Sequence, residues 1–147
     1  MAKKKRERYG KKSKVEVEIG DKMADGTIFA GELADGKALY ALPEDSPGPI
    51  TLEAAKKIAR NMKSKKADDL SEWHVPDMEE LNTLFNNQNE KSLSGSFNGN
   101  TYWTSSMDQS GNLARSFSFN TSKGMSDMVS KHNKNSVRLV RTGPFPL

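Results

Sequence analysis

The chain has 147 residues, the size of one domain, and 34% of them are hydrophobic while 29% are charged. It contains no cysteine, which excludes disulfides, thiolate metal sites and cysteine nucleophiles. Residues 1–14 hold eight of the 23 Lys and Arg residues but one of the 19 Asp and Glu residues, so the basic character belongs to the N-terminus and the rest is mildly acidic.

The sequence has no apolar run near the roughly 20 residues that a membrane-spanning helix needs. The lysines at the N-terminus are not followed by a hydrophobic segment, so no secretory signal is predicted. We therefore expect a cytoplasmic or virion-associated protein, or one that is exported without a cleaved signal.

Residues 1–13 are predicted to form a basic flexible tail, and residues 14–147 a single domain. Two interpretations of the tail stay open: a solvated segment, or an arm that contacts nucleic acid or an acidic protein surface. Tyr9 is the one tail residue that could stack on a base, so sequence-specific recognition is not expected. The anion-contacting candidates are Lys3, Lys4, Lys5, Arg6, Arg8, Lys11 and Lys12.

Apolar and acidic residues alternate over residues 14–19, which predicts a half-buried strand. Asp-Gly pairs at 25–26 and 35–36 predict turns beside two further strands, at 27–30 and 38–42. These segments are expected to form a hairpin or a short meander.

Three prolines and a glycine in residues 43–49 predict a loop, and Thr51 then caps a first helix. The apolar stripe of that helix is narrow and rich in alanine, as suits a helix that lies close to a sheet. It consists of Leu52, Ala55, Ile58, Ala59 and Met62.

The fold is organised around residues 73–81, where a short apolar strand ends at Pro76 and a second helix begins at once. Asp77 and Glu80 have the spacing of a capping box. Apolar residues then recur at helical spacing from Met78 to Phe85. This junction fixes the angle between a strand and a helix.

Three later strands are predicted, at residues 101–106, 115–120 and 136–141. Phe117 and Phe119 lie on one face of the middle strand. Residues 121–135 are polar and are expected to be irregular. Short strands, two helices and long polar loops predict an α+β fold.

Several blocks of sequence resemble the C-terminal domain of bacterial collagen-like adhesins of the Lcl type. They are Trp73-His74-Val75-Pro76 with Glu80-Leu81, then Tyr102 to Ser106, Val137 to Arg141, and the opening Gly20 to Gly31. The resemblance covers about residues 15–141. It implies a C-type-lectin-like fold, in the superfamily that includes formylglycine-generating enzymes, with small twisted, mostly antiparallel sheets and two flanking helices.

The chain departs from the family at His74, where members usually carry arginine, and at Asp77, where they usually carry threonine. Formylglycine-generating enzymes use cysteines, so the resemblance implies their scaffold and not their oxidase activity. Calcium-binding relatives need clustered carboxylates and amides, and Asp108, Asn112, Asn120 and Asp127 form no such motif. No cofactor and no metal site is predicted.

The resemblance places ligand contacts in the polar segment 107–135, which offers amides and cations. The predicted ligand-binding residues are Asp108, Gln109, Asn112, Arg115, Asn120, Lys123 and Asn133. We therefore expect a non-enzymatic binding module for a protein, a glycan or an assembly partner, as in a phage, prophage or surface-associated structural protein. The alternative is a structural assembly protein anchored to nucleic acid or an acidic partner through its tail.

A few residues have both a structural and a chemical interpretation. Trp73 and Trp103 are expected in the core rather than as stacking platforms. His74 and His132 lie too far apart for a metal pair, and the carboxylates near His74 already have a capping role. Arg138 and Arg141 are expected to pair with acidic residues rather than to bind an anion, and no catalytic residue is assigned.

Overall fold

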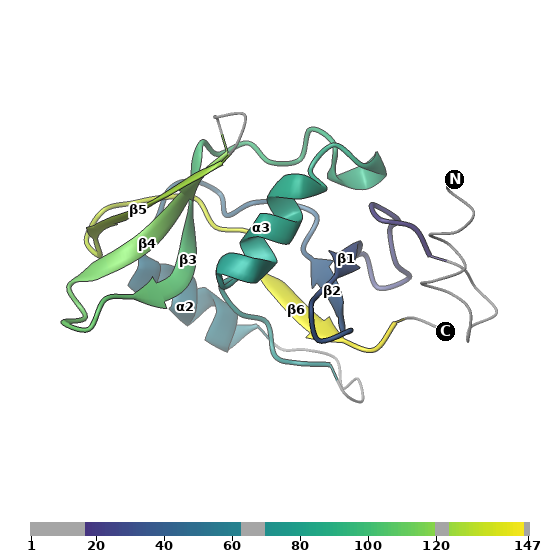
Figure 1. Cartoon of the computed structure of the whole chain (residues 1–147), viewed down its shortest axis with the longest axis horizontal. Helices are drawn as coiled ribbons and strands as arrows, with labels where there is room; N and C mark the ends of the chain where they lie inside the picture. The colour runs from purple at the N-terminus through teal and green to yellow at the C-terminus, as the bar shows by residue number, and fades with distance from the viewer. Residues whose placement is uncertain (1–16, 63–69, 120–123, 146–147) are drawn as a thin grey trace.

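The structure, a computed structural model, describes residues 17–62, 70–119 and 124–145. Two small sheets contain strands in the orders β1-β2-β6 and β3-β4-β5, and every strand pair is antiparallel (Figure 1). With two α-helices beside them, they confirm the predicted α+β class. The elements in chain order are β1 (Ile28–Glu32), β2 (Ala38–Ala41), α2 (Leu52–Asn61), α3 (Met78–Asn86), the 3₁₀ helix η1 (Lys91–Leu93), β3 (Thr101–Met107), β4 (Leu113–Ser118), β5 (Met125–Ser130) and β6 (Val140–Gly143).

The first sheet joins the beginning and the end of the chain. β1 and β2 form the predicted hairpin around Asp35-Gly36, whose glycine has a φ of +88°, a conformation that suits a residue without Cβ. β6 then pairs with β2 from Ala38–Gly143 to Ala41–Val140. A segment near the C-terminus therefore completes a sheet that the N-terminal part started.

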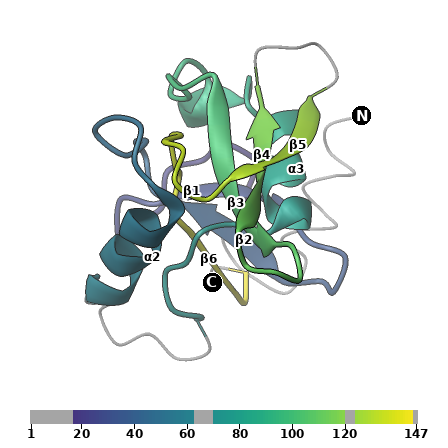
Figure 2. The same ribbon diagram turned by 90° about the vertical axis from the view of Figure 1, so that its left-hand side faces the viewer.

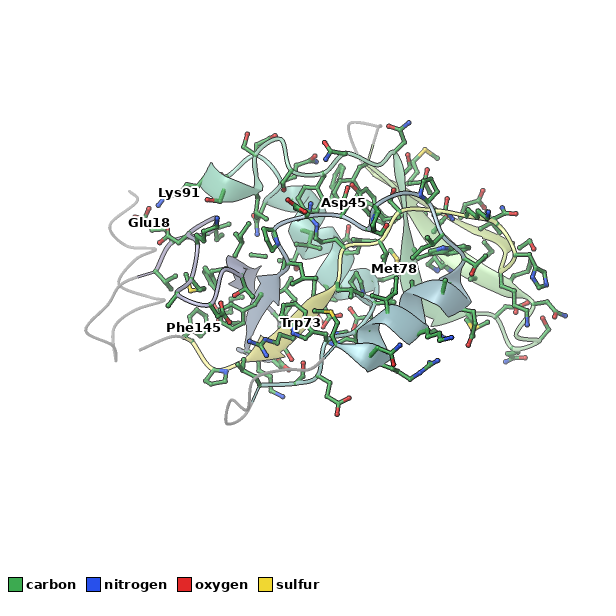
Figure 3. The ribbon with its side chains drawn as sticks, turned by 180° about the vertical axis from the view of Figure 1, so that it is seen from behind. Glu18, Asp45, Trp73, Met78, Lys91 and Phe145 are labelled. Carbon is green, nitrogen blue, oxygen red and sulfur yellow. The ribbon has the colours of Figure 1, made fainter. Side chains whose placement is uncertain are left out.

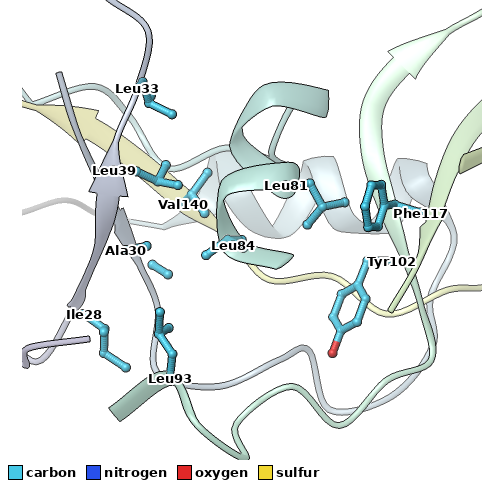
Figure 4. Packing of buried hydrophobic residues seen from close by; sticks show 11 residues of the cluster. Ile28, Ala30, Leu33, Leu39, Leu81, Leu84, Leu93, Tyr102, Phe117 and Val140 are labelled. Atoms are coloured by element: carbon cyan, nitrogen blue, oxygen red, sulfur yellow. The ribbon is translucent and has the colours of Figure 1, made fainter. Parts of the chain in front are cut away.

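Helix α3 lies between the two sheets and supplies the core of both. Its capping box is formed as predicted: the Asp77 carboxylate accepts the Glu80 N–H at 2.8 Å, and the Glu80 carboxylate accepts the Asp77 N–H at 2.9 Å. Leu84 lies toward Ala30 of the first sheet, while Leu81 lies toward Phe117 of the second (Figure 4). Fully burying a leucine is worth about 1.5–3 kcal/mol, so this helix couples the sheets.

Helix α2 packs on the opposite face of the second sheet from α3 (Figure 2). Thr51 caps it as predicted, accepting the Ala54 N–H at 3.2 Å. Leu52, Ala55 and Ala59 are buried with Trp103. Ile58 is 41% exposed, so its predicted place in the apolar stripe was wrong.

Three predicted strands are absent or shortened in the described residues, where irregular backbone still buries apolar side chains. Residues 73–76 form one isolated bridge, between His74 and Val140, because the following proline has no N–H with which to continue a ladder. The last strand begins at Val140 rather than at residue 136. Among residues 14–19, the described positions 17–19 are not in a strand, although Val17 is buried.

The prediction that residues 121–135 are irregular was also wrong. Residues 125–130 form β5, which pairs with β4 along its full length. None of its residues is buried, so it lacks the apolar alternation by which a strand is usually recognised. Residues 125–130 of the segment that was expected to be irregular are therefore part of a three-stranded sheet.

Candidate ligand-binding site

Two adjoining polar grooves lie on one side of the molecule, and we call them together the polar trough. The first has a volume of about 690 Å³ and lies between residues 44–49, 98–101 and 134–136. The second has a volume of about 560 Å³ and lies over β4, β5 and the following turn. Thr101 and Asn135 line both grooves, which makes the trough continuous.

The Asp45 carboxylate holds the first groove together from inside. It lies between the two sheets (Figure 3) and accepts the Tyr102 hydroxyl at 2.6 Å. It also accepts the backbone N–H groups of Asn98 at 2.8 Å and Gly99 at 3.2 Å. One carboxylate therefore connects the loop before α2 to the segment that leads into β3.

Arg138 neutralises this buried carboxylate. Its guanidinium lies 2.8 Å from Asp45, and the two side chains are 0% and 6% exposed. The guanidinium also donates to the Leu42 and Ser96 carbonyls and lies 4.1 Å from the centre of the Phe97 ring. Burial lowers the pKa of Arg138, while its ion pair and hydrogen bond with Asp45 oppose that shift; burial together with the hydrogen bond to Asp45 raises the pKa of Tyr102.

The proline loop is fixed to the C-terminal segment by backbone hydrogen bonds. Ser46 donates its N–H to the Val137 carbonyl at 2.8 Å, and its hydroxyl accepts the Val137 N–H at 3.2 Å. Ile50 and Asn135 exchange two backbone hydrogen bonds, at 2.8 and 2.9 Å. Both walls of the first groove are therefore rigid.

Close packing beneath the groove requires a glycine at position 99. A Cβ placed on Gly99 would lie 2.6 Å from the Ser136 Cβ and would collide with the Ser136 hydroxyl. Gly48, in the opposite wall, has open space around it.

Four asparagines line the trough, and each is bound to the scaffold through its main chain. Asn98 donates its N–H to Asp45, Asn133 donates to the Ser130 carbonyl, the Asn100 carbonyl accepts from Phe119, and Asn135 pairs with Ile50. Their side-chain amides have no hydrogen-bond partner in the described part of the chain. The backbone is thus held while the amides remain available to a ligand.

The charges on the rim of the trough are mixed and few. Glu44, Asp127 and Lys134 are exposed, whereas the charge of Asp45 is compensated by Arg138. Because Asp45 already accepts several hydrogen bonds and pairs with Arg138, little of its carboxylate is left to contact a ligand. The arrangement suits hydrogen bonding better than acid–base chemistry.

The ligand-binding residues predicted from the sequence do not lie together in the structure. Asn133 lines the second groove. Gln109 and Asn112 are exposed in the β3–β4 turn, and Asp108 stabilises this turn by accepting from the Ser110 hydroxyl and the Gly111 and Leu113 N–H groups at 2.9–3.1 Å. The hydrogen bond with Leu113 is the main cause that lowers the pKa of Asp108.

Arg115 lies on the other face of the sheet, because it pairs with Met128 whereas the neighbouring Ser116–Asp127 pair faces the groove. Its guanidinium donates to Ser126 at 3.0 Å. Asn120 and Lys123 lie outside the described residues, as does the whole tail of residues 1–13. Ligand contact by this set stays a prediction.

The structural interpretations of the other singled-out residues are confirmed. Trp73 and Trp103 are 8% and 0% exposed. Arg138 pairs with Asp45, and Arg141 pairs with Asp25 at 3.0 Å. His74 contacts the Glu80 carboxylate at 2.9 Å, so the carboxylate of the capping box also binds the histidine of the junction.

Sequence reasoning missed Asp45, Asn98, Asn100 and Asn135. The signals for these residues were a proline-rich loop and the Asn98-Gly99-Asn100 cluster, two features that lie more than 40 residues apart in the chain. The fold brings them together through the Asp45 carboxylate, and Arg138, a further 38 residues on, bonds to both sides.

These features define a small α+β module with a rigid polar trough. The model of one family, the Lcl C-terminal domain, matches residues 24–141, and the chain belongs to that family. The matched range contains every residue that lines the trough, and it indicates an adhesin-like module. No curated protein matches the chain significantly. Within the described ranges, no helix is long and apolar enough to cross a membrane.

Proposed function

We propose that the chain is a non-enzymatic binding module that uses the polar trough to bind a hydroxyl-rich ligand, a glycan. The observation that carries the proposal is the pair of grooves that share Thr101 and Asn135 above a buried ion pair. Rigid walls reduce the entropy lost on binding, which favours affinity for a small polar ligand.

The chemistry of the lining supports a neutral glycan over a polyanion. Amides, hydroxyls and carboxylates donate to and accept from sugar hydroxyls, whereas two exposed carboxylates beside one lysine would repel a polyanion. The lining groups are Glu44, Ser46, Asn98, Asn100, Thr101, Asp127, Asn133, Lys134, Asn135 and Ser136. Membership of the Lcl C-terminal domain family agrees with a binding role.

A glycan array, followed by calorimetry on any saccharide that binds, tests the proposal. Asn100→Ala and Asn135→Ala each remove one amide and should weaken binding roughly three- to tenfold, the worth of a hydrogen bond. Asn112→Ala is the matched control, since it removes an exposed amide from the β3–β4 turn.

Loss of binding in Asn112→Ala, with the two trough variants unaffected, would instead place the ligand on the β3–β4 turn and refute the trough. An array without any bound saccharide would refute the glycan class. The alternative role, anchoring through the basic tail, rests on residues outside the described ranges and stays a separate prediction.

A further inference from the structure

Edge strands present backbone groups without partners, and two three-stranded sheets have four edges: β1, β6, β3 and β5. The first of these is covered by the chain itself. Phe29 of β1 donates its N–H to Asp21 and accepts from Gly20. The neighbouring Ala30 carbonyl accepts the Asn87 side chain at 2.8 Å.

Two more edges are covered in the same way. On β6, Val140 exchanges two backbone hydrogen bonds with His74, and the Thr142 carbonyl accepts from Ser71. On β3, residues 101 and 103 bond to Ser136, and Ser105 donates to the Pro76 carbonyl. Irregular segments thus close these edges without adding a full strand.

The register of β5 shows which of its backbone groups point away from β4. The Lys131 N–H donates to the Asn112 carbonyl, a bond that brackets the Leu113–Ser130 pair. Leu113 and Ser130 are therefore a non-hydrogen-bonded pair. Such pairs alternate with hydrogen-bonded pairs along an antiparallel ladder, so residues 125, 127 and 129 bond to β4. Residues 126, 128 and 130 direct their N–H and carbonyl groups outward.

No other segment of the described chain bonds to this outer side. The Met128 N–H is bonded at 2.9 Å, but to the carboxylate of its own neighbour Asp127, and the Ser130 carbonyl accepts from Asn133 within the same turn. All six residues of β5 are exposed or half-buried, and Met125 is 62% exposed. Figure 1 shows β5 at the end of the molecule remote from the first sheet. β5 is therefore the open edge of the described structure.

We propose that β5 pairs with β5 of a second copy of this chain, antiparallel and with Met128 opposite Met128 of the partner subunit. Outward residues 126, 128 and 130 then meet residues 130, 128 and 126 of the partner subunit, as a bonded register requires. The half-buried Met128 side chains of the two subunits meet on the twofold axis.

Charge complementarity favours a second copy in this register. Residue 127 lies opposite residue 129 of the partner subunit, so its two diagonal neighbours are Lys131 of the partner subunit, which brings an opposite charge on a long side chain, and Asp127 of the partner subunit. The Asp127 carboxylate can then release the Met128 N–H and bind that lysine instead, so that the N–H can donate to the partner strand. Because of the twofold symmetry, this change of partner occurs in both subunits.

A single open edge gives a closed assembly. An isologous contact uses the edge on both chains, so the pair ends at two subunits and cannot grow into a filament. A twofold axis normal to the sheet keeps corresponding residues on one face, and the second grooves of both subunits then lie on the same side of a six-stranded sheet. This inference does not depend on which ligand the trough binds.

Sedimentation and light scattering of the full chain without ligand, over a concentration series that extends to millimolar, test the proposal. We expect a reversible monomer–dimer equilibrium. Met128→Lys and Met128→Glu each place like charges opposite each other and should raise the dissociation constant about tenfold or more. An equimolar mixture of the two variants should restore the dimer, because opposite charges then meet.

Ile58→Lys and Ile58→Glu are the matched controls, since Ile58 is an exposed apolar residue on α2 and its replacement should leave the dimer intact. A wild-type chain that stays monomeric, an assembly larger than two, or a dimer unaffected by Met128→Lys would each overturn the proposal. So would a variant mixture that fails to associate while both variants keep the wild-type circular dichroism spectrum.

Discussion

Arg138 and Arg141 lie three residues apart on one segment and each pairs with an aspartate from a distant loop or turn, yet their surroundings differ. The Arg138–Asp45 pair lies between the sheets beneath the polar trough and is almost fully buried. The Arg141–Asp25 pair lies at the first sheet, where the aspartate is 49% exposed. The two pairs therefore differ in role: the buried pair connects three segments, whereas the half-exposed pair stabilises one turn.

The largest expected effect comes from removing the partner of the buried arginine. Asp45→Ala leaves the Arg138 guanidinium uncompensated and removes acceptors from Tyr102, Asn98 and Gly99. We expect a loss of about 3–5 kcal/mol in the free energy of unfolding, measured by denaturant titration. Asp25→Ala should cost about 1 kcal/mol or less, because solvent screens that pair. Equal losses in the two variants would contradict the distinction.

A smaller effect is expected from crowding the floor of the trough. Gly99→Ala should destabilise the chain by about 1–3 kcal/mol, because the new methyl group collides with Ser136. Gly48→Ala is its control, since nothing lies within 4 Å of the added Cβ. Thermal unfolding of both variants measures the difference, and a Gly99→Ala variant as stable as Gly48→Ala would show that the floor adjusts freely.

The smallest expected effect is a pH dependence of the free energy of unfolding. It arises at the strand–helix junction before α3, on the side of the first sheet. Burial alone would lower the pKa of His74, but hydrogen bonds to the Glu80 carboxylate and the Glu72 carbonyl outweigh it and raise the pKa above the ordinary value of 6.5. Both ring nitrogens face acceptors, at 2.9 Å each, which favours the doubly protonated ring.

Because the folded-state pKa of His74 exceeds the unfolded value, its contribution to stability is complete below pH 6.5 and is lost as pH rises through the folded-state pKa. We expect a decrease of less than about 1 kcal/mol, since His74 is partly exposed. His74→Gln should flatten this part of the profile of unfolding free energy against pH. An unchanged profile would exclude His74 as the titrating group.

Much of the fold could be predicted because its signals are local. The capping box of Asp77 and Glu80, the Thr51 cap and the Asp-Gly hairpin involve residues within a few positions of one another. β5 could not be predicted in this way, since Met-Ser-Asp-Met-Val-Ser has no buried face and becomes a strand because β4 offers it a ladder. The strand predicted at residues 136–139 is absent for the opposite reason. Their apolar pattern suits a strand, but Val137 and Leu139 bond to the loop at residues 42–46 and Ser136 alone bonds to β3, so no continuous ladder forms.

The site was harder to predict because its parts are distant in sequence. Asp45 and Arg138 are 93 residues apart, and neither a loop aspartate nor an arginine among valines and leucines identifies its partner. The polar segment 107–135 contains β4 and β5, and its predicted residue Asn133 lines the trough; ligand binding by the segment stays a prediction. The asparagines contributed by residues 98–100 could be recognised as lining residues only once the fold was known.

Attachment of the four trough asparagines through the main chain alone makes their identity dispensable for folding. A side chain of similar size at positions 98, 100, 133 or 135 leaves the same backbone bonds in place, while it changes the hydrogen-bonding pattern presented to a ligand. Recognition can therefore diverge at little cost in stability, and one framework can serve relatives that prefer different ligands.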